Sequence, residues 1–124
     1  MKKIVGFCLA MVLIFSISSV AFADIVLVNE QTVEGGSSYS SEVWDLKKSN
    51  GKKLNVYVKN NAKSGTVTVD VFYKNTKIGG DKIKPGGSHK TVTVPVDKNG
   101  KYSFKINRSS SGDPLNVFVH ARQY

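Results

Sequence analysis

The stretch from residue 54 to residue 73, LNVYVKNNAKSGTVTVDVFY, decides the fold class. Apolar side chains alternate with other side chains in both of its halves, with valine at every second position. A repeat of two places alternate side chains on opposite faces of an extended strand. The centre of the stretch, residues 60–65, is rich in turn-forming residues. The two halves are therefore expected to pair as a β-hairpin.

Similar runs continue on both sides of this stretch, and no part of residues 24–124 shows a long helical repeat. The run at 25–28 is apolar at every position, which predicts a strand covered on both faces. Pro95 suits an edge strand. Further strands are expected at 43–46, 76–79, 91–96, 102–107 and 115–121. Seven or eight short strands separated by turns predict an all-β protein, an antiparallel β-sandwich.

The first 23 residues have the layout of a secretory signal peptide. A basic start is followed by an apolar stretch that ends in serines, and Ala21-Phe22-Ala23 supplies the small residues that a signal peptidase needs. Cleavage is expected after Ala23, which makes Asp24 the first residue of the mature chain. The sequence thus predicts a secreted protein whose residues 24–124 form one domain, with no membrane-spanning segment after processing.

The single cysteine, Cys8, lies inside the signal peptide, so the predicted mature chain contains no disulfide. Removing Lys2 and Lys3 lowers the formal net charge from +9 to +7, and lysine supplies nearly all the positive charge. Lysines often guard exposed strand edges. The alternative is that they attract an external anionic polymer of the cell envelope. Lysine is a hydrated point charge and not a bidentate ligand, so either interpretation implies loose contacts.

The segment at 30–41, EQTVEGGSSYSS, has the composition of a flexible linker between the first strand and the rest of the domain. In the simplest interpretation it crosses from one sheet to the other. In the alternative, the strand at 25–28 is tethered loosely enough to pair with a neighbouring copy as a donor strand. That alternative predicts a self-assembling protein of a matrix or surface layer.

Residue patterns that carry catalysis or bind cofactors are missing from the sequence. The serines lie outside any nucleophile elbow, and nothing brings His89 and His120 together or next to a carboxylate. The carboxylates are scattered along the chain, and several of them fall in turns. The turn at 97–100 has too few oxygen ligands for a calcium loop. The prediction is a protein that is not an enzyme and has no metal and no cofactor.

Three aromatic residues are expected on the outer faces of the strands. Tyr57, Phe72 and Phe118 alternate with valines that should face the core, and Lys59 lies on the same side as Tyr57. In one interpretation, these rings cap the core where loops fold over them. In the other, they form an exposed platform flanked by lysine, which would mark a binding face.

These features predict a non-enzymatic binding or structural module acting at or outside the bacterial cell envelope. Its partner would be a glycan, a wall polymer or another protein, held by the outer-face aromatics and lysines. Nucleic acid is a poorer partner, because arginine is scarce and the protein is exported. Besides self-assembly, a second alternative is a cationic antimicrobial or toxin-like protein, whose action would weaken as salt screens the lysines.

Overall fold

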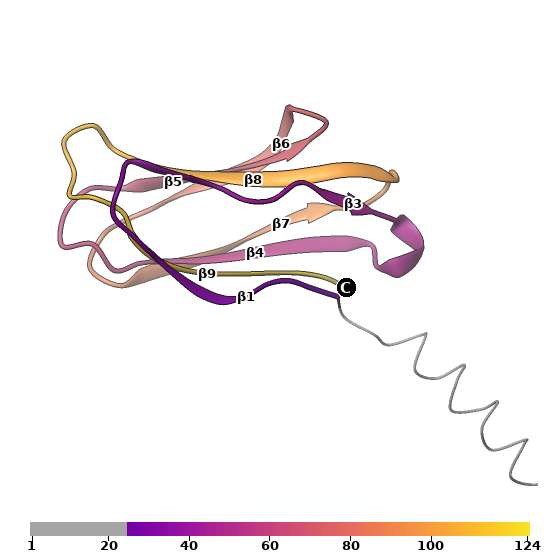
Figure 1. Ribbon diagram of the computed structural model, residues 1–124, viewed down its shortest axis with the longest axis horizontal. Coiled ribbons are helices and arrows are strands. Elements are labelled where there is room, and N and C mark those ends of the chain that lie inside the picture. Colours follow the sequence, from indigo (N-terminus) through magenta and orange to yellow (C-terminus); the bar gives the residue numbers. More distant parts are fainter. Residues whose placement is uncertain (1–24) are drawn as a thin grey trace, which may run out of the picture.

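The computed structural model describes residues 25–124, which form two antiparallel sheets packed face to face (Figure 1). The predicted β-sandwich is confirmed, with nine strands. In chain order the strands are β1 (Ile25–Glu34), β2 (Ser38–Ser40), β3 (Trp44–Leu46), β4 (Lys53–Asn60), β5 (Val67–Tyr73), β6 (Thr76–Ile83), β7 (Ser88–Pro95), β8 (Gly100–Arg108) and β9 (Asn116–Gln123). One short 3-10 turn, η1 (Lys48–Asn50), precedes β4.

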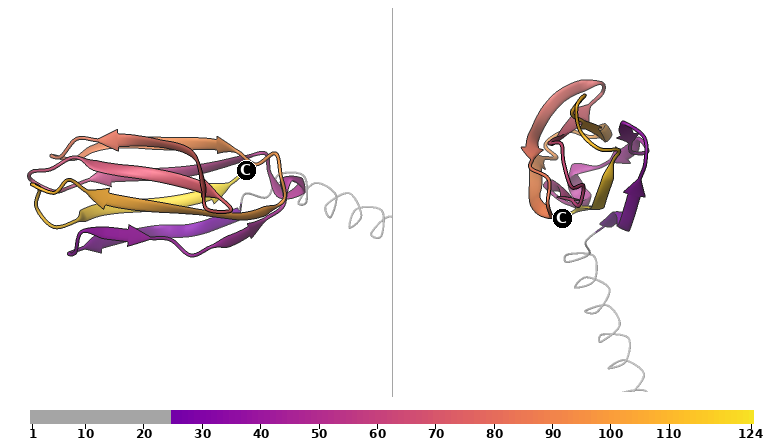
Figure 2. Two further views of the ribbon diagram at one scale, coloured as in Figure 1. Left: turned by 90° about the horizontal axis from the view of Figure 1, so that it is seen from above. Right: turned by 90° about the vertical axis from the view of Figure 1, so that its left-hand side faces the viewer.

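The first sheet has the strand order β1-β9-β4-β7, and the second has the order β2-β8-β5-β6. The short strand β3 also belongs to the second sheet, because it pairs with β8 beyond the end of β2. One flank of the sandwich therefore consists of β1 with β2 and β3, and the opposite flank consists of β6 and β7 (Figure 2). Pro95 lies on an edge strand, as predicted.

The core lies between the two sheets and consists of the inward-facing side chain of every second residue. In β4, for example, Leu54, Val56 and Val58 are fully buried, while the residues between them are half-buried. Valine suits these positions because its branched side chain packs well on a pleated surface. Tyr102 and Phe104 of β8 are the largest core side chains. Both sheets and the core between them are formed by residues 25–124.

The predicted hairpin between residues 54–59 and 67–73 is wrong. β4 lies in the first sheet and β5 in the second, so the chain crosses from one sheet to the other between them. Alternation alone could not reveal this, because a strand has the same pattern whether the next strand joins its own sheet or the facing one. The crossing turns at Gly65, whose φ is 92° and whose place for a Cβ lies 2.6 Å from the Cα of Gly112.

The N-terminal segment also differs from the expectation. In place of a linker at 30–41, the structure has the end of β1 and all of β2, joined by a tight turn at Gly35 and Gly36. The run at 25–28 is not covered on both faces, because Val26 is 57% exposed on an edge strand. Register shifts between Val26 and Val28 and between Val28 and Gln31 interrupt the pairing of β1 with β9. The first of these shifts lets two consecutive residues, Leu27 and Val28, pack against the core.

The predicted signal peptide at 1–23 and its cleavage site at Ala21, Ala23 and Asp24 lie outside the described residues and stay predictions. Within residues 25–124, no helix is long and apolar enough to cross a membrane.

Asn60 at the end of β4 ties the two sheets together. Its side chain is fully buried. The amide nitrogen donates to the carbonyl oxygens of Gly65 at 3.0 Å and Ile83 at 3.1 Å, and the amide oxygen accepts from the backbone N–H of Ala62 at 3.2 Å. A buried polar backbone group that loses its partner is costly, so this one side chain holds the crossing in place.

We expect Asn60→Ala to lower the free energy of unfolding by about 2–4 kcal/mol, because it leaves backbone groups of three residues without their partner. Urea unfolding followed by circular dichroism measures this change. The matched control is Asn61→Ala at the exposed neighbouring position, which should change stability by less than about 0.5 kcal/mol. Equal effects of the two substitutions would contradict this role of Asn60.

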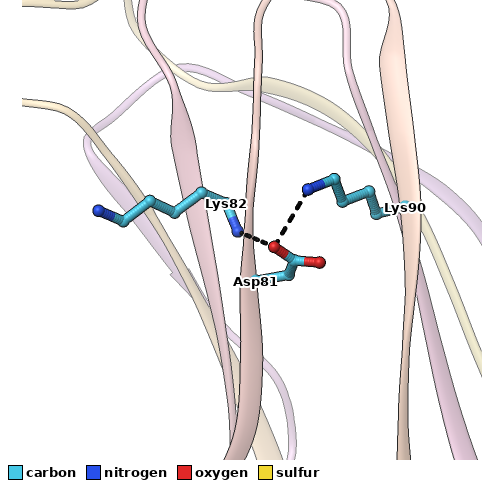
Figure 3. Close-up of polar contacts among 3 residues, drawn as sticks. All are labelled: Asp81, Lys82 and Lys90. Carbon is cyan, nitrogen blue, oxygen red and sulfur yellow. Dashed lines mark hydrogen bonds and ion pairs between the residues drawn. The ribbon is translucent and has the colours of Figure 1, made fainter.

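The flank formed by β6 and β7 is closed by close contact between the sheets. A Cβ at Gly79 of β6 would lie 2.6 Å from a methyl group of Val94 on β7, so only glycine fits there. The Asp81 carboxylate accepts from the adjacent Lys82 backbone N–H at 2.8 Å, and across the same gap it lies 3.1 Å from the Lys90 ammonium (Figure 3). These two hydrogen bonds, the backbone one first, lower the pKa of Asp81 below its ordinary value.

Lys90→Met should therefore raise the pKa of Asp81 only part of the way to its ordinary value, because the backbone hydrogen bond remains. Titration of the carboxyl carbon by NMR measures this shift. Since the folded-state pKa is lowered, the contact stabilises the fold above the ordinary aspartate value, and this contribution is lost as the pH falls through the folded-state pKa. An Asp81 pKa unaffected by Lys90→Met would contradict the contact.

Candidate functional site

The four residues of the predicted binding face lie on both outer faces of the sandwich. Tyr57 and Lys59 on β4 and Phe118 on β9 lie together on the outer face of the first sheet. Phe72 on β5 lies on the outer face of the second sheet, on the far side of the core. This separation follows from the crossing after β4, which places the two strands in different sheets. All three aromatic side chains are half-buried.

On the first sheet, Tyr57 is the centre of a cluster of rings from three neighbouring strands. The imidazole of His120 on β9 stacks on the Tyr57 ring at 4.6 Å between centroids, with 9° between the planes. His89 on β7 lies 5.5 Å away on the opposite side. Phe118 meets the Tyr57 ring edge-on at 6.2 Å. That the two histidines share one neighbour could not be predicted, because the order of the strands cannot be read from the sequence.

This ring cluster offers little flat surface to a ligand. β4 lies between β7 and β9, so the two imidazoles approach the Tyr57 ring from opposite sides. The faces of the ring that would stack on a sugar are occupied by neighbours in the same sheet. Cross-strand aromatic pairs of this kind stabilise a sheet. The geometry therefore favours a structural role for Tyr57.

The outer face of the second sheet is hollowed into a groove. Two adjoining hollows of about 680 and 250 Å³ share Val43, Asn75 and Ser103 in their walls. The larger hollow is completed by Asp45, Lys74, Asn99, Gly100 and Lys101. The smaller is completed by Ser40, Ser41, Phe72, Phe104 and Lys105. The groove thus contains Phe72 from the predicted binding face, and its walls carry hydroxyl, amide and ammonium groups.

One wall of the groove is the edge segment that links β2 to β3. The chain leaves regular pairing at residues 41–43, and Val43 there is 62% exposed. Ser41 fixes this segment on β8: its backbone N–H donates to the Phe104 carbonyl at 2.9 Å, and its hydroxyl accepts from the Phe104 N–H at 2.8 Å. The apolar rim at Val43 is therefore positioned by the sheet itself.

The opposite wall is the turn between β5 and β6. Lys74 and Asn75 both have positive φ, 48° and 68°, as tight hairpin turns of the I′ type require. The Lys74 N–H donates to the Lys101 carbonyl at 2.9 Å, which fixes the turn to β8. Asn99 is held as well, because its carbonyl accepts from the Tyr73 hydroxyl at 3.2 Å and its side chain accepts from the Lys48 N–H at 2.8 Å. Both walls are thus preorganised.

The charge of the groove is positive. Lys74, Lys101 and Lys105 line it against a single carboxylate, Asp45. Asp70, which pairs in register with Lys105, already has an ion partner, because the Lys77 ammonium lies 3.0 Å from its carboxylate. Cationic side chains around a hollow favour anionic ligands. Among residues 25–124, no group of three or more histidine, aspartate and glutamate residues could hold a metal ion.

Comparison with known proteins reveals similarity in fold. No family model matches the sequence, and no curated protein matches it. A solved structure of Bacillus endospore appendages, described as a family of disulfide-linked pili, is similar with a TM-score of 0.51 and 13% identity over 83% of this chain and 90% of that chain. A carbohydrate-binding module in complex with calcium and xylotriose has a TM-score of 0.41 and 13% identity, covering 82% and 98%. At 13% identity, the likeness to the appendage structure extends to the fold alone.

The structural role of the ring cluster can be measured with a double-mutant cycle. Tyr57→Ala and His120→Ala should each lower the free energy of unfolding, and the coupling energy between them should be about 0.5–1.5 kcal/mol. Urea unfolding of the two single variants and the double variant measures this. The matched control pairs Tyr57→Ala with Thr68→Ala on the other sheet, where no coupling is expected. Additive effects of Tyr57→Ala and His120→Ala would contradict the stacking.

Proposed function

We propose that the protein is a secreted, non-enzymatic binding module that holds an extended anionic glycan or wall polymer of the cell envelope in the groove of the second sheet. The observation that carries this proposal is the continuous groove itself, with Phe72 inside it and three lysines around it. Ligand sites are typically concave, with an apolar lining and a few placed polar groups.

The groove suits a polymer of sugar or polyol units better than a compact small molecule. It is open and runs over two adjoining hollows, so a chain can lie along it and continue past both ends. Phe72 and Val43 offer apolar contact to the C–H faces of such units. Ser103 and Asn75, which both hollows share, can exchange hydrogen bonds with hydroxyl groups.

The lysines favour a ligand that carries negative charge. Lysine is a flexible point charge without the planar fork of arginine, so it suits repeated loose contacts along a polymer. Carboxylate groups of an acidic glycan and phosphate groups of a wall polymer present the same anionic chemistry. Such binding should weaken as salt screens the charges.

Self-assembly with residues 25–28 as a donor strand is the second candidate. The observation that favours it is the interrupted pairing of β1 with β9, where two register shifts weaken the ladder that holds this strand in its own sheet. The similar fold of the Bacillus appendage subunits, described as pili, supports a structural role of this kind. In the structure, β1 remains in its own chain, so donation would require it to leave β9.

Binding to the groove can be tested by retention on immobilised polymers. Phe72→Ala/Lys101→Ala should lower the affinity by at least about tenfold, because it removes an apolar contact and a charge from the groove. The matched control is Phe118→Ala/Lys59→Ala, which makes the same changes on the first sheet and should retain binding. Columns of a phosphate-containing wall polymer, a carboxylated polysaccharide and a neutral polysaccharide separate the two anionic sources from uncharged glycan.

Two results would contradict the proposal. One is the absence of retention of the unaltered protein on all three columns. The other is loss of retention in the control double variant while the groove variant is still retained. That result would assign the binding site to the first sheet.

A further inference from the structure

The two flanks of the sandwich carry opposite charge. Residues 25–46, which contain β1, β2 and β3, are named here the acidic flank, because they have four carboxylates and no basic residue. Residues 74–90, which contain β6 and the start of β7, are named the basic flank, because they have five lysines and one aspartate. The sheet orders place these flanks on opposite sides of the molecule (Figure 2).

Among residues 25–124, the carboxylates of the acidic flank have no ion partner. Its four carboxylates are all exposed, at Glu30, Glu34, Glu42 and Asp45. The two ion pairs found among residues 25–124 join Asp81 to Lys90 and Asp70 to Lys77, and neither includes one of these carboxylates. On the basic flank, the same two pairs occupy Lys77 and Lys90, while Lys82 and Lys84 are exposed outside them.

The acidic flank also has a hollow between its two strand edges. Among the described strands, β1 pairs with β9 alone and β2 and β3 pair with β8 alone, so the backbone edges of the flank are open. Between these edges lies a hollow of about 200 Å³. Its lining residues are Leu27, Val28, Asn29, Gln31, Tyr39, Glu42 and Trp44.

The basic flank has an exposed apolar side chain, Ile78. Ile78 on β6 is one of the few large apolar residues that are exposed, at 39%. It is the extra residue in the register shift where Phe72 pairs with Lys77 and Val71 with Gly79. A β-bulge of this kind redirects a side chain out of the regular alternation. Ile78 is thus an exposed aliphatic side chain on a strand that also carries Lys77 and Lys82.

We propose that the partner of the acidic flank is the basic flank of a second copy of this chain. Lysines of one copy face the carboxylates of the next, and Ile78 enters the hollow between β1 and the β2–β3 edge. Like flanks repel each other, so the contact is heterologous and not two-fold symmetric. Each added copy leaves one flank of each kind open, and the contact therefore builds linear chains of molecules.

This contact shares wall residues with the groove at 40–45 and 74–75, but it does not use Phe72 or the lysines of β8, and it does not need strand exchange. β1 stays paired with β9, so the association is reversible and sensitive to salt, whereas a donated strand would be held by main-chain hydrogen bonds. Edge lysines can also serve only to keep strands apart. Reversing the charge of one flank at a time, and then mixing the two variants, distinguishes the two roles.

Sedimentation velocity of purified residues 24–124 tests the proposal. The unaltered protein should form chains whose length grows with concentration, and the association constant should fall by at least about tenfold between roughly 0.02 M and 0.5 M salt. Glu30→Lys/Glu34→Lys and Lys82→Glu/Lys84→Glu should each be monomeric alone. Their equimolar mixture should associate again, because the basic flank of the first variant meets the acidic flank of the second.

The matched control is Lys52→Glu/Lys63→Glu, which makes the same charge change just before and just after β4, at positions that belong to neither flank. It should associate like the unaltered protein. Phe72→Ala in the groove should do so as well, so failure of the groove proposal leaves this result unchanged. Ile78→Ser should weaken the association at low and high salt alike. A monomer at millimolar concentration in low salt, association that salt does not weaken, or a mixture that stays monomeric would overturn the proposal.

Discussion

The contact between the valine-rich inner faces of two sheets holds this protein together. β4 and β9 in the first sheet and β5 and β8 in the second bury nearly every inward-facing side chain, and residues 25–124 contain no cysteine that could form a disulfide. The outer faces are therefore free to differ from each other. One carries a cluster of stacked rings and the other a groove. This difference between the two outer faces depends on each strand keeping its valine side chains in the core.

The same constraint explains the two polar side chains in the core. Where the chain passes from one sheet to the other, backbone N–H and C=O groups become buried and need hydrogen-bond partners. Asn60 supplies them at the crossing after β4, and Gln123 does so at the far end, where its amide donates to the carbonyls of Lys47 and Gly51 at 2.7 and 2.9 Å. The amide side chains of Asn60 and Gln123, one at each end of the core, thus fix how the sheets are joined.

The fold class could be predicted from the sequence because a period of two is a local property. The strand partners could not, since Val56 and Val69 look alike whether β4 and β5 share a sheet or face each other. That ambiguity placed Phe72 beside Tyr57, whereas the structure separates them by the core. It also hid the groove, which is assembled from residues 40–45, 72–75 and 99–105. The charge difference between the flanks was visible in the sequence, but only the strand order places the flanks on opposite sides.

The assignment of β4 and β5 to different sheets underlies the whole account, and nuclear Overhauser effects between backbone protons test it directly. The account predicts cross-strand contacts of Val58 with Val119 and of Val69 with Ile106, as the register of β4 with β9 and of β5 with β8 requires. A ladder of contacts joining residues 54–60 to residues 67–73 would contradict it, because Tyr57 and Phe72 would then share one face.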